Sequence, residues 1–87
     1  MQKKRVNTML KLKNIKMNNG IISAEYDPEN SGALGYVSVD IKSGRIVESN
    51  VSEYDKNFPI YLNHAVSYLE KLALQDSVPK EKIVMWY

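Results

Sequence analysis

The residues best suited to acid–base chemistry lie between positions 61 and 71, where Tyr61, His64, Tyr68 and Lys71 follow one another at three- and four-residue spacings. Such spacings place side chains on one side of a helix. His64 is the only histidine of the chain, and a neutral imidazole can act as a general base. Catalysis also needs a group that orients the imidazole, and the pattern supplies none. We therefore interpret His64 as a helix-surface residue and predict a protein that is not an enzyme.

Two interpretations of Tyr61, His64 and Tyr68 stay open at the level of sequence. The two tyrosines border the apolar stripe of the predicted helix, where such residues bury their rings and keep their hydroxyls in water. Alternatively, aromatic and cationic side chains on one helix side suit recognition of a protein or of unstacked bases. We predict these three residues as partner-binding candidates.

Other motifs that could form a nucleophile site or a metal site lack residues or a local geometry that such a site requires. The segment "SVPK", residues 77–80, has the Ser-x-x-Lys spacing of a serine acyl-enzyme, but Pro79 opposes the helix that this motif requires. The acidic segment 27–30 lacks the ligand alternation and the closing Glu of a calcium loop. The chain has no cysteine and only one histidine, so transition-metal sites are unsupported. We predict neither a metal nor a cofactor.

The elements that position these residues begin with a β-hairpin around Asn19-Gly20. Both positions of a two-residue hairpin turn need positive φ, which Asn tolerates and Gly adopts freely. The turn pairs Met17 with Ile22 and predicts that both face the core. Leu12 has the wrong parity for the core in this register, so we predict a bulge near residues 13–14 that restores it.

A second hairpin is predicted for residues 36–49, "YVSVDIKSGRIVES". Gly44 closes a four-residue loop, Asp40 pairs with Arg45, and Val39 pairs with Ile46. Continued without interruption, the same register gives the pairs Ser38–Val47, Val37–Glu48, Tyr36–Ser49 and Leu34–Val51.

An apolar stripe predicts one helix over residues 59–75. The last strand is predicted over residues 82–87. The helix has a single apolar stripe and begins near Pro59, with Asp55 or Asn57 as its cap. The β-branched and aromatic end of the chain, "KIVMWY", is typical of a strand that pairs with an existing sheet edge. The stripe is formed by Leu62, Ala65, Val66, Leu69, Leu72 and Ala73. The sequence therefore predicts an α+β fold in the order β-β-β-β-α-β, with the helix on one face of an antiparallel sheet.

The charge distribution divides the chain into a basic N-terminal end and an acidic remainder. Residues 1–19 carry six bases and no acid, whereas the other six bases are outnumbered by ten acids. We predict a flexible basic N-terminus over residues 1–8 and a single α+β domain over residues 9–87. The bases at issue are Lys3, Lys4, Arg5, Lys11, Lys13 and Lys16. Three of them align on one strand face, which makes nucleic-acid binding the alternative function.

The leading hypothesis is a protein–protein interaction module that acts as a homo-oligomer. The predicted registers put Tyr36 and Val47 on one face of the sheet and Val39 and Ile46 on the other, so both faces carry apolar side chains. One helix can cover only one of the two faces, and the sequence does not determine which. We predict Tyr36 and Val47 as further partner-binding positions. No apolar run is long enough for a membrane span, and the N-terminus lacks the apolar middle region of a secretory signal. We expect a cytoplasmic protein without membrane contact.

Overall fold

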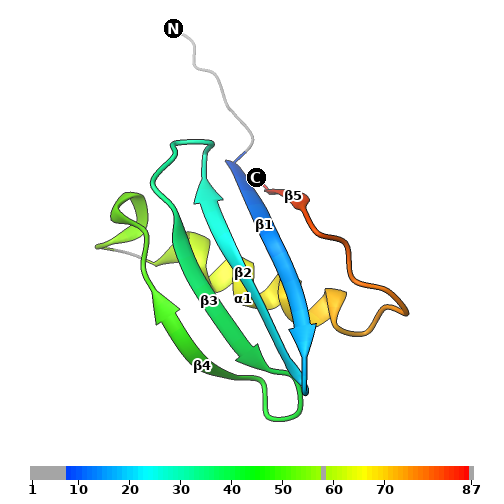
Figure 1. The fold of residues 1–87 in the computed structure, drawn as a ribbon. Helices are drawn as coiled ribbons and strands as arrows, with labels where there is room; N and C mark the ends of the chain where they lie inside the picture. The colour runs from blue at the N-terminus through cyan, green and yellow to red at the C-terminus, as the bar shows by residue number, and fades with distance from the viewer. Residues whose placement is uncertain (1–7, 58, 87) are drawn as a thin grey trace, which may run out of the picture.

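The described part of the chain forms one five-stranded antiparallel sheet with one α-helix packed against it, which confirms the predicted α+β fold. The computed structural model describes residues 8–57 and 59–86, and Figure 1 shows their arrangement. The strands lie in the order β4-β3-β2-β1-β5. In chain order the elements are β1 (Thr8–Asn18), β2 (Ile21–Pro28), β3 (Gly35–Asp40), β4 (Arg45–Asn50), the short 3-10 helix η1 (Glu53–Asp55), α1 (Ile60–Leu72) and β5 (Lys82–Trp86).

The first hairpin has the predicted turn, register and bulge. Asn19 and Gly20 both have positive φ, at 53° and 79°, and Met17 pairs with Ile22. The register shifts between Lys13 and Lys16, so two β1 residues face one residue of β2. Asn14 occupies the bulge with a φ of 52°. This extra residue is what turns the leucines of β1 and the later Ile15 toward the same side.

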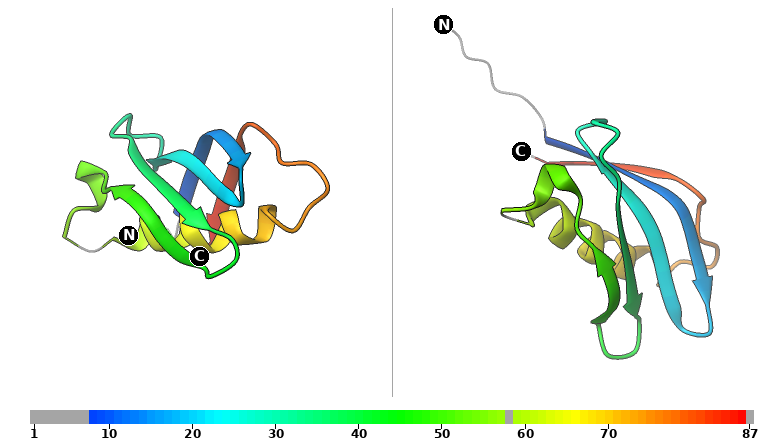
Figure 2. Two further views of the ribbon diagram at one scale, coloured as in Figure 1. Left: turned by 60° about the horizontal axis from the view of Figure 1, so that its bottom comes forward. Right: turned by 60° about the vertical axis from the view of Figure 1, so that its left-hand side comes forward.

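The hydrophobic core lies between the sheet and α1. Figure 2 shows α1 on one side of the sheet only. Each strand contributes every second residue to this side, as the pleat requires. The helix stripe is as predicted, with Val66 and Ala73 half-buried at its border. The buried members are Leu10, Leu12, Ile15, Ile22, Ala24, Tyr26, Val37 and Val39 from the sheet, and Leu62, Ala65, Leu69 and Leu72 from the helix.

The second hairpin follows the predicted register only next to its turn. Asp40 pairs with Arg45 and Val39 with Ile46, as predicted. The register then shifts, and Ser38 pairs with Glu48 rather than with Val47. The predicted pairs beyond this point are therefore wrong, because Val47 is an extra residue that a turn-based register cannot anticipate. Tyr36 consequently pairs with Asn50, and Val37 with Ser49.

Helix α1 begins at Ile60 and is capped by a residue from further back in the chain. Pro59, directly before the helix, makes no side-chain capping bond. The carboxylate of Asp55 instead accepts hydrogen bonds from the backbone N–H groups of Tyr61 and Leu62, at 3.1 and 2.8 Å. One of the two predicted capping residues, Asp55, therefore fills this role, and it does so from within η1 rather than from the usual capping position.

Two predictions concern the ends of the chain. Strand β5 pairs with β1 from Thr8↔Trp86 to Leu12↔Lys82, so the last strand does join an existing edge. The predicted flexible segment of residues 1–8 falls outside the described residues, except for Thr8, which begins β1. No helix within the described ranges is both long and apolar enough to cross a membrane.

Candidate interaction surface

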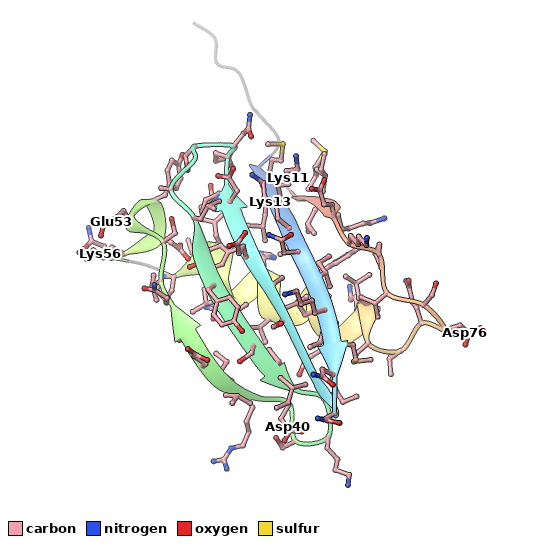
Figure 3. The ribbon with its side chains drawn as sticks, in the orientation of Figure 1. Lys11, Lys13, Asp40, Glu53, Lys56 and Asp76 are labelled. Atoms are coloured by element: carbon pink, nitrogen blue, oxygen red, sulfur yellow. The ribbon has the colours of Figure 1, made fainter. Side chains whose placement is uncertain are left out.

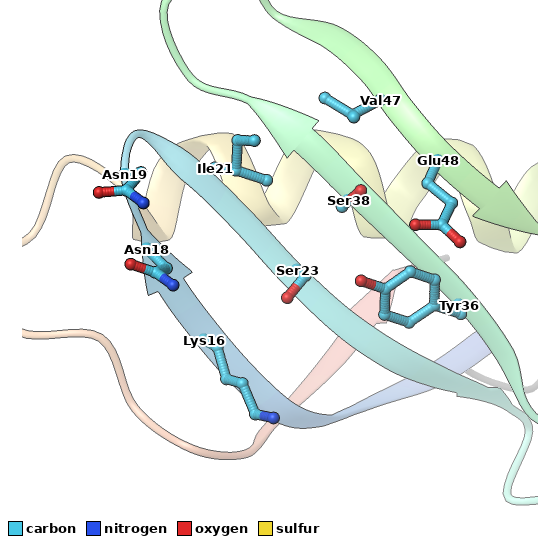
Figure 4. Close-up of a pocket in the computed structure, with 9 residues that line it drawn as sticks. All are labelled: Lys16, Asn18, Asn19, Ile21, Ser23, Tyr36, Ser38, Val47 and Glu48. Carbon is cyan, nitrogen blue, oxygen red and sulfur yellow. The ribbon is translucent and has the colours of Figure 1, made fainter.

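The face of the sheet opposite α1, called the open face here, contains a shallow hollow of about 450 Å³. Strands β1 to β4 and the first hairpin turn all contribute to it (Figure 4). Its lining mixes apolar groups, hydroxyls, amides and charges of both signs. The lining residues are Lys16, Asn18, Asn19, Ile21, Ser23, Tyr36, Ser38, Val47 and Glu48.

Tyr36 and Val47 come together in this hollow from neighbouring strands. Tyr36 lies opposite Glu25 of β2 and Asn50 of β4, so its side chain projects from an interior strand next to the β4 edge. Figure 4 shows its ring on the open face beside Ser23 and Glu48. Val47 follows Ile46, which lies on the helix side, so alternation places Val47 on the open face. Because Val47 is an extra residue, Glu48 after it also lines the hollow. The two predicted partner-binding residues of the sheet thus share one surface.

Strand β4 is the least covered element of the sheet. All six of its residues are exposed. Ile46 lies on the helix side opposite the buried Val39, yet it remains 45% exposed because α1 packs against β1, β2 and β3 instead. The open face and the β4 edge therefore form a continuous accessible region that contains the apolar side chains of Ile46 and Val47.

The helix residues of the predicted partner-binding set lie on the other side of the sheet. Tyr61 and Tyr68 are half-buried and pack against the core, and His64 is half-buried beside them on α1. The structure therefore separates the predicted set into Tyr36 with Val47 on the open face, and the three helix residues on the covered side.

Tyr61 has a defined structural partner. Its hydroxyl donates to Oε2 of Glu29 at 2.8 Å, and its ring meets the ring of Tyr54 edge-on at 5.5 Å. The same carboxylate oxygen accepts from the backbone N–H of Met9 at 2.9 Å. Burial raises the pKa of the Tyr61 phenol, and the hydrogen bond to Glu29 raises it further. These contacts connect the first turn of α1 to β1. The ring of Tyr61 packs at the border of the core, as the border-residue interpretation has it, but its hydroxyl bonds a carboxylate of the protein.

The lysines of β1 do share the open face, because the bulge at Asn14 gives Lys16 the same orientation as Lys11 and Lys13. Lys11 and Lys13 both lie on β1 (Figure 3), and each has an acidic neighbour. Lys11 Nζ lies 4.0 Å from Glu81, and Lys13 Nζ lies 3.8 Å from the buried carboxylate of Asp27. These acids reduce the positive potential along β1. The other residues proposed for nucleic-acid binding, Lys3, Lys4 and Arg5, lie outside the described residues.

A buried polar network at the helix side was not anticipated from the sequence. The hydroxyl of Tyr26 accepts from the backbone N–H of Ser52 at 2.9 Å and donates to Asp55 at 3.4 Å. All three residues are at most 2% exposed. Burial raises the pKa of the Tyr26 phenol. The available signal was the parity of Tyr26, which matches the core residue Ala24, since a buried tyrosine hydroxyl needs a partner.

The acidic residues of segment 27–30, Asp27 and Glu29, accept hydrogen bonds from backbone N–H groups and hydroxyls of the protein. Asp27 Oδ1 accepts from the backbone N–H of Gly32 at 2.9 Å and from the hydroxyl of Ser31 at 3.4 Å. Glu29, as described above, accepts from Met9 and Tyr61. Across residues 8–57 and 59–86, no three His, Cys, Asp or Glu side chains come close enough together to hold a metal ion.

Comparison of the chain with protein-family models, with curated proteins and with solved structures gives no match. The arguments for function consequently come from the geometry of the open face and of the sheet edges.

Proposed function

We propose that the protein is a non-catalytic protein–protein interaction module of the cytoplasm that acts as a homo-oligomer and presents the open face to a protein partner. The observation that carries the proposal is the one-sided cover of the sheet. Helix α1 leaves all of β4 exposed and leaves Tyr36 and Val47 in an accessible hollow. Surfaces of this kind, with apolar groups ringed by polar ones, are typical of protein interaction sites.

The composition of the hollow favours a protein as the partner. Tyr36, Ile21 and Val47 supply apolar area, and the tyrosine type is enriched at protein interfaces. Lys16 and Glu48 place one charge of each sign at its border. A partner with its own mixed polar rim matches such a border, whereas a phosphate backbone is attracted to one charge and repelled by the other.

The test compares the natural protein with variants of the hollow in capture from the native host. Val47→Lys adds charge at an exposed position and should leave the fold intact. Leu74→Lys is the matched control, because Leu74 is exposed and lies beyond α1. We expect a host protein that is retained by the natural chain and by Leu74→Lys, and lost with Val47→Lys and Tyr36→Ala. Equal retention by all four proteins would contradict the proposal.

Nucleic-acid binding is the second candidate, favoured by the three lysines on one strand face, of which Lys16 lines the same hollow as Tyr36. Its test is the binding of random single- and double-stranded oligonucleotides at low salt, where electrostatic attraction is strongest. Lys16→Glu should then weaken binding more than Lys71→Glu on the helix. Failure of the natural protein to bind under these conditions would end this candidate.

A further inference from the structure

The two edges of the sheet differ in how well they are protected against pairing with another strand. Edge strand β4 has a bulge at Val47 and carries Arg45 and Glu48. Bulges and charged side chains are the devices by which natural sheets block edge-to-edge association. Strand β4 is therefore a poor template for an additional strand, even though its side chains are exposed.

Edge strand β5 lacks these devices. Its five residues pair with β1 without any register shift, and Lys82, at its start, is its only charged residue. Ile83 and Met85 lie opposite Lys11 and Met9 and so belong to the open face. They are 53% and 55% exposed. Among the described strands β5 is the outermost on the side of β1, so one row of its backbone N–H and C=O groups faces away from β1. A regular, apolar edge of this kind is a template for strand addition.

We propose that β5 pairs with the β5 strand of a second copy in an antiparallel, two-fold arrangement centred on Val84. The proposal rests on the self-association part of the proposed function and names its site. The resulting sheet has ten strands, and the open faces of both copies form one continuous surface. The new contact leaves the hollow around Tyr36 and Val47 accessible, because that hollow lies toward the opposite edge.

The residue types of β5 favour a second copy as the occupant. With Val84 opposite Val84 of the second copy, Ile83 of each copy lies opposite Met85 of the other. Cross-strand pairs of this kind have their side chains on the same face, so four exposed apolar side chains come into contact. Only this register pairs all five residues of β5, and it sets no like charges opposite each other. A shift that centres the pairing on Lys82 would oppose two ammonium groups.

The proposed pairing stops at a dimer. Each copy uses its β5 edge, and the edges that remain are the two β4 strands, with their bulge and their charges. A two-fold contact is closed by symmetry, whereas β4-to-β5 pairing would continue into a fibre. An interface of five residues per copy is small, so we expect a dissociation constant on the order of 10 μM, typical of weak, transient contacts.

The test is a charge-swap experiment read by sedimentation equilibrium over a concentration series. The double variant Ile83→Lys/Met85→Lys puts like charges opposite each other in the proposed pairs, as does Ile83→Glu/Met85→Glu. We expect each double variant alone to dimerise at least about tenfold more weakly than the natural protein. An equimolar mixture of the two should form a heterodimer at least as tight as the natural dimer. Circular dichroism and urea unfolding verify that each variant is folded, and Leu74→Lys serves as the surface control.

The other outcomes separate this proposal from the proposed function. A natural dimer that both double variants leave unchanged would place self-association elsewhere and overturn the β5 pairing alone. A natural protein that stays monomeric at several hundred micromolar would overturn both the pairing and the homo-oligomer, while partner capture through Val47 would remain a separate result. Open-ended association of the natural protein would contradict the closed two-fold arrangement.

Discussion

Oδ2 of Asp55 accepts a hydrogen bond from the backbone N–H of Leu62 at 2.8 Å, which joins η1 to the first turn of α1. Its other carboxylate oxygen accepts from Tyr61, and the buried hydroxyl of Tyr26 donates to the same side chain. One carboxylate thus satisfies two orphan N–H groups of the helix and one phenol of the sheet. It connects the two layers of the fold at the point where α1 begins.

Replacement of this carboxylate should be among the most destabilising single changes in the chain. We expect Asp55→Ala to lower the free energy of unfolding by about 2–4 kcal/mol, because it removes a helix cap and leaves buried donors without acceptors. Asp55→Asn retains one acceptor oxygen and should cost less. Urea unfolding followed by circular dichroism measures both. Asp76→Ala, at an exposed position after the helix (Figure 3), is the control, and an equal effect there would refute the capping role.

The bulge in β1 places Asn14 in the left-handed backbone region, so the residue type at this position should affect stability. A φ of 52° is accessible to Asn and Gly but strained for a β-branched residue. We expect Asn14→Val to destabilise the protein by about 1–2 kcal/mol relative to Asn14→Gly. Both variants lose the hydrogen bond that Asn14 Nδ2 donates to Glu25 at 2.8 Å, so the difference between their urea midpoints isolates the backbone effect. Equal stability of the two variants would argue against a left-handed residue at this position.

The two bulges show what the sequence could and could not predict about the sheet. The β1 bulge was predictable because Leu12 and Ile15 have conflicting parities around a turn that Asn19-Gly20 determines, and burying both requires an extra residue. The β4 bulge gives no such signal. Ile46, Val47 and Glu48 are all exposed, so no burial requirement fixes which of them is the extra residue.

The residues of the candidate surface were likewise predictable where local strand alternation determines their position, and not where their position depends on the tertiary fold. The sequence predicted that Tyr36 and Val47 share one face of the sheet, because strand alternation determines the face on which a residue lies. Which of the two faces the helix covers was left open, because both faces carry apolar residues. The sequence could not decide whether Tyr61 is a border residue of the helix or a partner-binding residue. The contacts of Tyr61 with Glu29 and Tyr54 depend on the tertiary fold, and the sequence pattern does not reveal them. Nor could it rank the two sheet edges, because the identity of the edge strands depends on the strand order.

The phenol of Tyr61 should make the stability of the protein depend on pH in the alkaline range. Its pKa in the folded protein is raised above the ordinary value of 10.0 by burial and by the Glu29 carboxylate. Above that ordinary value the unfolded chain has lost the proton that the folded chain retains. The contribution of Tyr61 to stability is therefore complete below about pH 10 and is lost as pH rises further.

The measurement compares the natural protein with Tyr61→Phe by urea unfolding at about pH 8 and about pH 11. At the lower pH, Tyr61→Phe should be less stable by about 1–2 kcal/mol, because a hydrogen bond to a carboxylate is lost. At the higher pH the gap between the two proteins should narrow. A gap that stays constant across this range would show that Tyr61 titrates alike in the folded and unfolded chains. Tyr36→Phe on the open face is the control for the general titration of tyrosines.

Gly35 should be intolerant of any side chain, although its backbone does not require glycine. It is buried at the start of β3 opposite Tyr26, and a Cβ atom built there would overlap the Tyr26 ring. That ring cannot easily move, because its hydroxyl bonds both Ser52 and Asp55. We expect Gly35→Ala to cost about 2–3 kcal/mol through overpacking. Gly32→Ala, where a Cβ meets open space but φ is +81°, should cost only about 1 kcal/mol from backbone strain. If thermal unfolding gave the reverse order, Tyr26 would have to be more mobile than its hydrogen bonds imply.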